Sequence, residues 1–247
     1  MLRLRQTWIG AGAISALALI LGCSEAPGAP VSLSEAGDST AVLSETEGGA
    51  QIPFAKLKLF LEFNSTDDDL GVQLLLDAPD WEWVKGHDPR GRRVVDIDAR
   101  GRLRDLGITE LFFESAEPSP EEVLALIPAG VYGFSGKTVD GERLTGTATL
   151  SHNLPPAPVF SPSNGELVDA KNLVITWKAI GGLASFQVIV VDEALGREIV
   201  ADVAPSVTSF QVPATFLRPN AQYKAEVLSV ATTGNKTITE GTFQTKP

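Results

Sequence analysis

Short runs rich in apolar residues, separated by turn-forming residues, limit what this chain can fold into more than any other feature. Runs of four to eight residues lie between clusters of Gly, Pro, Asp and Asn. In Tyr223–Val230, apolar side chains largely alternate with polar ones. Alternation of this kind is typical of a β-strand with one buried face. The sequence therefore predicts an all-β chain, with strands over residues 57–63, 72–76, 81–85, 93–98, 109–114, 130–136, 144–150, 173–177, 186–191, 209–212, 223–230 and 237–243.

One segment departs from the strand pattern. Ser119 can cap a helix, Pro120 suits its first position, and Pro128 ends it, so a helix is predicted over residues 119–127. Further on, Asp140 and Gly141 form a strong turn signal between two of the predicted strands. These strands are expected to form a hairpin.

The chain divides into four parts. Residues 1–22 have the composition of a signal peptide, and residues 23–51 are rich in Ser, Glu, Ala, Gly and Pro without any aromatic residue, as expected of a disordered tether. Residues 52–154 and 155–247 are expected to form two β-sandwich-like domains in tandem. The second begins with the stiff sequence Pro-Pro-Ala-Pro at residues 155–158.

The N-terminal segment resembles a bacterial lipoprotein signal. Arg3 and Arg5 precede an apolar run that is too short to cross a bilayer, and the sequence Ile-Leu-Gly-Cys at residues 20–23 is similar to a lipobox. The resemblance implies that Cys23, the single cysteine of the chain, is lipidated. It places the protein in the cell envelope, at the outer membrane or the cell surface. A plain secretory signal and an uncleaved membrane helix are the two alternatives.

The second domain resembles a fibronectin type III module. Residues 217–223, Leu-Arg-Pro-Asn-Ala-Gln-Tyr, are similar to the tyrosine corner of that family, and Trp177 matches its core tryptophan. The resemblance implies a sandwich of about seven strands, with the Tyr223 hydroxyl bonded to a backbone carbonyl. The first domain looks like uncharacterised secreted bacterial proteins, which implies no activity.

Acidic residues in the first domain suggest a cation site. A cluster of aspartates at residues 67–69 lies in a predicted turn, and more carboxylates lie on neighbouring predicted strands. Calcium binds six to eight oxygen atoms in flexible geometry, so a calcium site formed at one end of the domain is one interpretation. Solvated turn residues are the alternative. The predicted ligands are Asp67, Asp68, Asp69, Asp96 and Asp98, with Asp77 and Glu114 nearby.

Arginines gather in the same domain. The pattern Asp-x-Arg-Gly-Arg occurs at residues 88–92 and again at residues 98–102, and six arginines lie between Arg90 and Arg104. Guanidinium groups bind carboxylates and phosphates, so an acidic glycan or a lipid head group is one candidate ligand. Two tight turns whose arginines neutralise adjacent aspartates are the alternative.

Composition narrows the classes of function. The formal net charge is −11, which argues against nucleic acid as a partner. Only two histidines occur, and no zinc-binding, phosphate-binding or nucleophile-elbow motif is present. The sequence thus favours a non-catalytic binding or spacer protein with a protein or glycan partner. A calcium-dependent or glycan-binding module and a hydrolase with an unrecognised site are the alternatives.

Overall fold

The computed structural model describes residues 50–247, which contain fifteen strands and two short helices. The all-β prediction is confirmed. The predicted signal peptide, Cys23 and nearly all of the predicted tether lie outside the described residues. Within residues 50–247, neither helix has the length and apolar character needed to span a bilayer.

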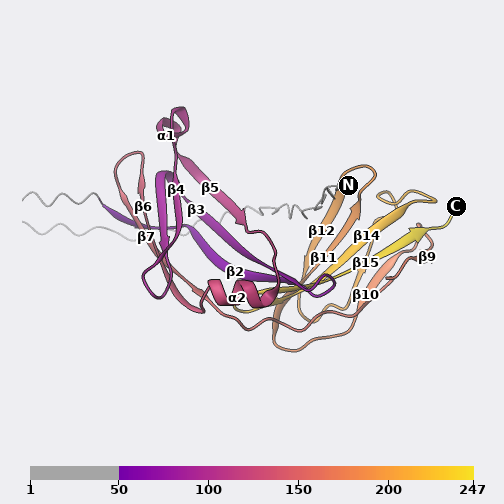
Figure 1. Ribbon diagram of the computed structural model, residues 1–247. Coiled ribbons are helices and arrows are strands. Elements are labelled where there is room, and N and C mark those ends of the chain that lie inside the picture. Colours follow the sequence, from indigo (N-terminus) through magenta and orange to yellow (C-terminus); the bar gives the residue numbers. More distant parts are fainter. Residues whose placement is uncertain (1–49) are drawn as a thin grey trace, which may run out of the picture. The chain divides into compact units, whose positions relative to one another are not determined.

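The elements follow the chain in two groups (Figure 1). The first group is β1 (Gln51–Pro53), β2 (Lys56–Asn64), β3 (Asp69–His87), β4 (Arg93–Asp98), α1 (Arg102–Leu106), β5 (Ile108–Glu114), α2 (Pro120–Leu126), β6 (Gly130–Thr138) and β7 (Arg143–Leu150). The second group is β8 (Phe160–Ser161), β9 (Glu166–Val168), β10 (Val174–Trp177), β11 (Leu183–Asp192), β12 (Arg197–Val203), β13 (Ser209–Gln211), β14 (Gln222–Ala231) and β15 (Lys236–Thr245). We call these groups the first and the second domain.

The first domain is organised around β3. Two separate strands were expected at residues 72–76 and 81–85, and this expectation is wrong, because both belong to one strand of 19 residues. The first half of β3 pairs with β2 and β5, whereas its second half pairs with β6 and β4. Both edges change partner near Pro79, which has no N–H to donate, and the pairing shifts register there. The irregularity lets one strand serve two differently directed parts of a sheet.

The core of the first domain lies between these parts. Leu61, Leu74, Trp81 and Leu144 are almost completely buried within it. Helix α2 covers one end of this core through Val123. The helix starts as predicted, since the Ser119 N–H and hydroxyl lie 3.2 and 3.0 Å from Glu122 Oε2. Helix α1 was not predicted, because its five residues carry no apolar period and bury no side chain.

The second domain is a fibronectin type III-like sandwich. One sheet has the order β13-β10-β8, and the facing strands have the order β15-β14-β11-β12. The side chains between the sheets include Trp177, whose ring centroid lies 5.5 Å from that of Phe186. The rings of Tyr223 and Phe243 stack at 5.3 Å. These aromatic contacts fill the space between the two sheets.

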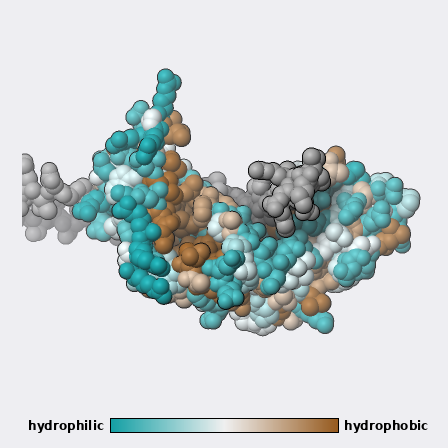
Figure 2. Space-filling view, viewed as in Figure 1, coloured by the Kyte–Doolittle hydropathy of each residue, from teal (hydrophilic) through white to brown (hydrophobic). Residues whose placement is uncertain are grey.

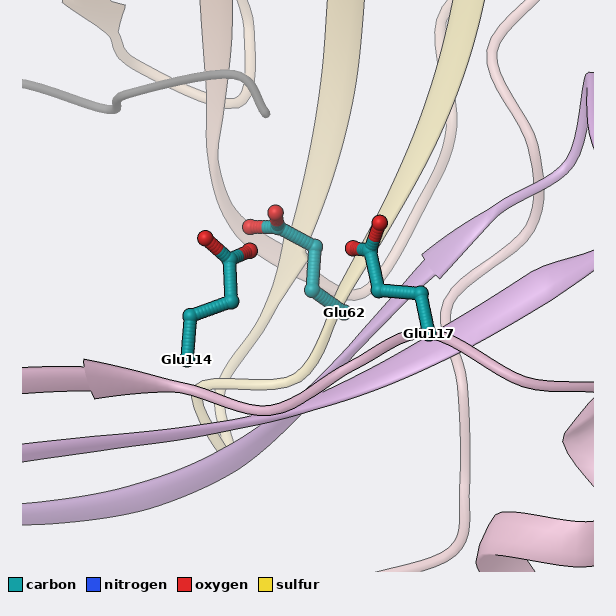
Figure 3. A group of neighbouring side chains, drawn as sticks. All are labelled: Glu62, Glu114 and Glu117. Atoms are coloured by element: carbon teal, nitrogen blue, oxygen red, sulfur yellow. The ribbon is translucent and has the colours of Figure 1, made fainter. Parts of the chain in front are cut away.

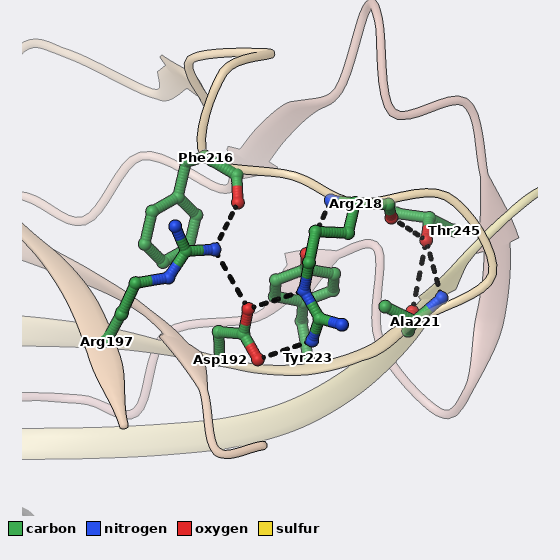
Figure 4. Close-up of polar contacts among 7 residues, drawn as sticks. All are labelled: Asp192, Arg197, Phe216, Arg218, Ala221, Tyr223 and Thr245. Carbon is green, nitrogen blue, oxygen red and sulfur yellow. Dashed lines mark hydrogen bonds and ion pairs between the residues drawn. The ribbon is translucent and has the colours of Figure 1, made fainter. Parts of the chain in front are cut away.

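The tyrosine corner is present, with a different hydrogen bond from the expected one (Figure 4). The Tyr223 hydroxyl accepts from the Arg218 backbone N–H at 2.7 Å, so the expected bond to a carbonyl is wrong. The guanidinium of Arg218 donates two bonds to buried Asp192, and Arg197 donates a third at 3.0 Å. Hydrogen bonding from Arg218 and Arg197 lowers the pKa of Asp192. This network holds the corner onto the sandwich.

The two domains share one sheet. Residues 236–238 of β15 pair in parallel with residues 62–64 of β2. Beside this pairing, the buried Asn235 side chain accepts from the Leu61 N–H at 2.9 Å. Its amide nitrogen donates to the carbonyls of Ser151 and Asn153 at 2.8 and 2.9 Å. Asn235 therefore connects a loop of the second domain with two segments of the first.

Candidate functional site

An apolar cleft of about 320 Å³ opens in the first domain, between the first half of β3 and the strands β4 and β6 that pair with its second half. Strands β2, β3, β4 and β6 contribute its walls, and the segment from β5 through α2 contributes the rest. Figure 2 shows hydrophobic surface gathered on this domain beside α2. The lining residues are Leu59, Val72, Leu74, Val94, Val95, Phe113, Ser115, Ala116, Pro118, Val123, Leu126, Ile127, Tyr132 and Phe134.

The polar side chains of the cleft are already satisfied. The Ser115 hydroxyl accepts from the Val72 N–H at 2.9 Å and donates to the Ala116 carbonyl at 2.8 Å. The Tyr132 hydroxyl donates to the Pro128 carbonyl at 2.7 Å, and burial raises its pKa. A polar ligand would lose its bonds to water here without new partners, which is unfavourable. The cleft is therefore suited to an apolar molecule.

The rim and the floor of the cleft differ in exposure. On the floor, Leu74 and Tyr132 are each only 1% exposed. On the rim, Phe113 and Leu126 are 48% and 69% exposed. Large apolar side chains that surround a concave opening are typical of binding surfaces, whereas single exposed apolar side chains are common on any protein. The floor is already packed, and the rim supplies further apolar contact area.

The arginine-rich segment lies next to this cleft. Arg92 pairs with buried Asp88 at 2.8 Å, and Arg93 pairs with Asp96 at 2.6 Å. Burial acts to raise the pKa of Asp88, but hydrogen bonds from Arg92 and Arg90 hold it below its usual value. These pairs match the alternative in which arginines neutralise nearby aspartates. Arg100 and Arg104 also face carboxylates, those of Asp98 and Glu82.

The structure distributes the five predicted calcium ligands over two places. Asp67 and Asp68 lie in the turn before β3, and Asp69 is the first residue of β3. In this turn Asp67 accepts from the Asn64 amide at 3.2 Å. Burial and the charges of neighbouring carboxylates raise the pKa of Asp69. Asp96 and Asp98 lie on β4, which pairs with the opposite half of β3. The fold therefore does not bring all five into one centre.

A different acidic cluster does form (Figure 3). Carboxylate oxygens of Glu62 on β2, Glu114 at the end of β5, and Glu117 after it lie within 4.8 Å of one another. Within residues 50–247 this is the group of carboxylates close enough to share a metal ion. Sequence reasoning noted Glu114 and missed the other two. Glu62 occupies a polar position of an alternating strand, which predicts a solvent-facing side chain, yet it is 4% exposed.

Burial and mutual repulsion shift the protonation of this cluster. Burial, followed by the charges of Asp69, Glu114 and Glu62, raises the pKa of Glu117 to about 7. Burial and the charge of Glu62 also raise the pKa of Glu114. Lys236 lies 3.0 Å from Glu62 and provides one compensating charge. The carboxylates thus remain in excess over the cations beside them.

Comparison with known proteins gives weak likenesses. No family model matches the chain, and no curated protein is similar to it in sequence. The FN1–FN3 domains of chicken CNTN1 match with 11% identity and a TM-score of 0.35, covering 81% of this chain and 66% of that one. A segment of two fibronectin type III domains from chicken tenascin matches with 14% identity and a TM-score of 0.31, covering 77% and 98%. A redesigned β-sandwich protein matches with 18% identity and a TM-score of 0.30, covering 39% and 97%.

Proposed function

We propose that this protein is a lipid-anchored protein of the cell envelope that binds an acyl chain in its first domain and catalyses no reaction. The apolar cleft is the observation that carries this proposal. Its volume of about 320 Å³ lies at the lower end of the range of roughly 300–1,000 Å³ common for small-molecule sites. The lining residues offer apolar contact and no unpaired polar group that would hold a sugar or a peptide backbone.

An acyl chain suits these walls energetically. Each methylene group removed from water contributes about 0.8 kcal/mol, so ten of them contribute roughly 8 kcal/mol before the entropy of association is subtracted. Subtracting about 4 kcal/mol for association leaves about 4 kcal/mol, which corresponds to a dissociation constant on the order of 1 mM. The satisfied hydroxyls of Ser115 and Tyr132 leave shape and apolar contact as the means of selection.

The remaining parts fit the role of an anchored binding protein. The resemblance of residues 20–23 to a lipobox supports an anchor at Cys23, and the composition of the following segment supports a flexible tether. The second domain, connected to the first through Asn235 and through the pairing of β15 with β2, serves as a spacer or docking body. In this account the ligand comes from the lipids beside which the protein is held.

Photocrosslinking of the full chain in membranes tests the proposal. The probe is a fatty acid that carries a diazirine in its acyl chain, and the crosslinked peptides are mapped by mass spectrometry. We expect crosslinks at the cleft, in peptides that contain Val72 or Val123. The substitution Ala116→Trp fills the cleft and should reduce their yield about tenfold.

Ala179→Trp is the matched control, because Ala179 is an exposed alanine of the second domain and lies outside the cleft. It should leave the crosslink yield unchanged. Crosslinks spread evenly over both domains, or an equal yield from Ala116→Trp, would contradict binding in the cleft.

A further inference from the structure

We propose that Glu62, Glu114 and Glu117, together with the side-chain oxygen of Gln73, form a calcium site in the first domain. This site is separate from the apolar cleft. It also differs from the aspartates that the sequence suggested as ligands.

The fold brings the three carboxylates together from distant parts of the chain. Their oxygens lie within 4.8 Å of one another, and Figure 3 shows the carboxylates of Glu114 and Glu117 on either side of that of Glu62. Gly71 pairs with Glu62 across the β2–β3 ladder. A Cβ atom at Gly71 would lie 3.2 Å from the Glu117 side chain, so glycine keeps the space that Glu117 occupies.

A buried polar atom beside the carboxylates provides an independent indication. Gln73 is 1% exposed, and its amide nitrogen donates to Glu114 at 3.0 Å. The same amide group carries an oxygen for which residues 50–247 offer no hydrogen-bond donor. A buried acceptor without a partner costs about 1–3 kcal/mol. A cation held by Glu114 and its neighbours would give this oxygen a partner.

The surrounding charges also favour a cation. Lys236 is the one basic side chain of the described residues within ion-pair distance of the three carboxylates, and it contacts Glu62. Lys224 is engaged by Glu226 and Glu240, at 2.7 and 3.4 Å. Three carboxylates therefore share one compensating cation. A divalent ion would relieve the repulsion between these carboxylates.

The ligand atoms select the type of ion. All four side chains offer oxygen, and neither histidine nor cysteine takes part, which favours a hard cation over zinc or copper. Calcium accepts six to eight oxygens in irregular geometry, including carboxylates that bind through both oxygens. Magnesium requires a near-ideal octahedron. Three carboxylates from separate segments, completed by the amide and by water, therefore suit calcium better.

Calcium binding to the full chain can be measured by equilibrium dialysis and by thermal unfolding, with magnesium chloride as the competing salt. We expect one calcium ion per chain at this site. At a free calcium concentration ten times the dissociation constant, the unfolding equilibrium constant should fall about elevenfold, which raises the melting temperature by a few degrees. An equal concentration of magnesium should have a smaller effect.

Two substitutions assign the binding to this cluster. Glu117→Gln removes a ligand charge from an exposed position, so the fold should be kept while the calcium-dependent shift is lost. Glu110→Gln, on the same strand as Glu114 and exposed, is the control and should keep the whole shift. No bound calcium at millimolar concentration, or an undiminished shift in Glu117→Gln, would overturn the proposal. Neither result depends on acyl-chain binding, which is measured separately.

Discussion

The two domains solve the problem of closing a β-sandwich in different ways. In the second domain, Trp177, Tyr223 and Phe243 fill the space between two sheets, and the corner at Arg218 secures the edge. In the first domain, β3 changes partners near Pro79, and a cleft remains between its first half and the strands β4 and β6 that pair with its second half. The closed domain buries its aromatic side chains, while the incompletely closed domain leaves an apolar cleft, which is the site of the proposed binding.

The same contrast appears in the charged groups. Asp192 in the second domain is buried and receives three hydrogen bonds from two arginines. Glu62 in the first domain is also buried, yet it faces two further carboxylates and one lysine. Hydrogen bonding from the arginines holds the pKa of Asp192 low, whereas burial and repulsion raise that of Glu117 to about 7. Asp192 is paired with two arginines and belongs to a structural network, whereas the three glutamates share one lysine and form the candidate site.

The largest effect is expected from truncation of the closed core. Trp177→Ala removes a buried ring that packs on Phe186 and should lower the free energy of unfolding by about 3–5 kcal/mol. Leu126→Ala on the rim of the cleft, where the side chain is 69% exposed, should lower it by less than about 0.5 kcal/mol. Urea unfolding of the two variants measures both values. Equal losses would remove the distinction between a closed and an open domain.

Loss of the connection between the domains comes next. Asn235→Ala leaves the Leu61 N–H and the carbonyls of Ser151 and Asn153 without their partner, at a cost of about 2–3 kcal/mol. Because these bonds cross between the domains, the variant should unfold in two calorimetric transitions where the parent unfolds in one. A single transition in the variant would show that Asn235 does not couple the domains.

A smaller effect is expected at the tyrosine corner. Tyr223→Phe keeps the ring stacked on Phe243 and removes the acceptor of the Arg218 N–H, so stability should fall by about 1–2 kcal/mol with the fold retained. The urea midpoint reports the loss of stability, and the near-ultraviolet circular dichroism of the aromatic side chains reports whether the fold is retained. A loss of tertiary signal would mean that the hydroxyl determines the fold and does more than stabilise it.

The smallest effect is the response to pH of the acidic cluster. Since the pKa of Glu117 is raised from 4.5 to about 7 in the folded state, the folded protein binds the proton more tightly than the unfolded chain does. Stability should therefore fall as the pH rises from about 5 to 8. The loss should be about 1 kcal/mol, because Glu117 is exposed and screened by solvent.

Thermal unfolding in the presence of a chelator measures this slope. Glu117→Gln should flatten it, and Glu110→Gln should not. A rise in stability over the same pH range in the parent would contradict the direction of the Glu117 shift.

Local patterns in the sequence were enough to predict most of the strands, helix α2 and the hairpin at Asp140, because alternation and turn chemistry act over a few residues. The resemblance of residues 217–223 to a tyrosine corner also predicted the position of Tyr223 in the second domain. Local patterns could not predict the cleft, because its walls form only when β3 continues through Pro79, where the sequence predicts an interruption. The acidic cluster depends on pairing between β2, β3 and β5, which no local spacing encodes.

Methyl NMR of the full chain during titration with dodecanoic acid tests the central claim most directly. If an acyl chain binds in the cleft, methyl groups of the cleft, such as those of Val72 and Val123, should shift saturably, while those of the closed core, such as Val188 and Val227, stay unchanged. Shifts in both domains alike, or no saturable shift in the cleft, would contradict it.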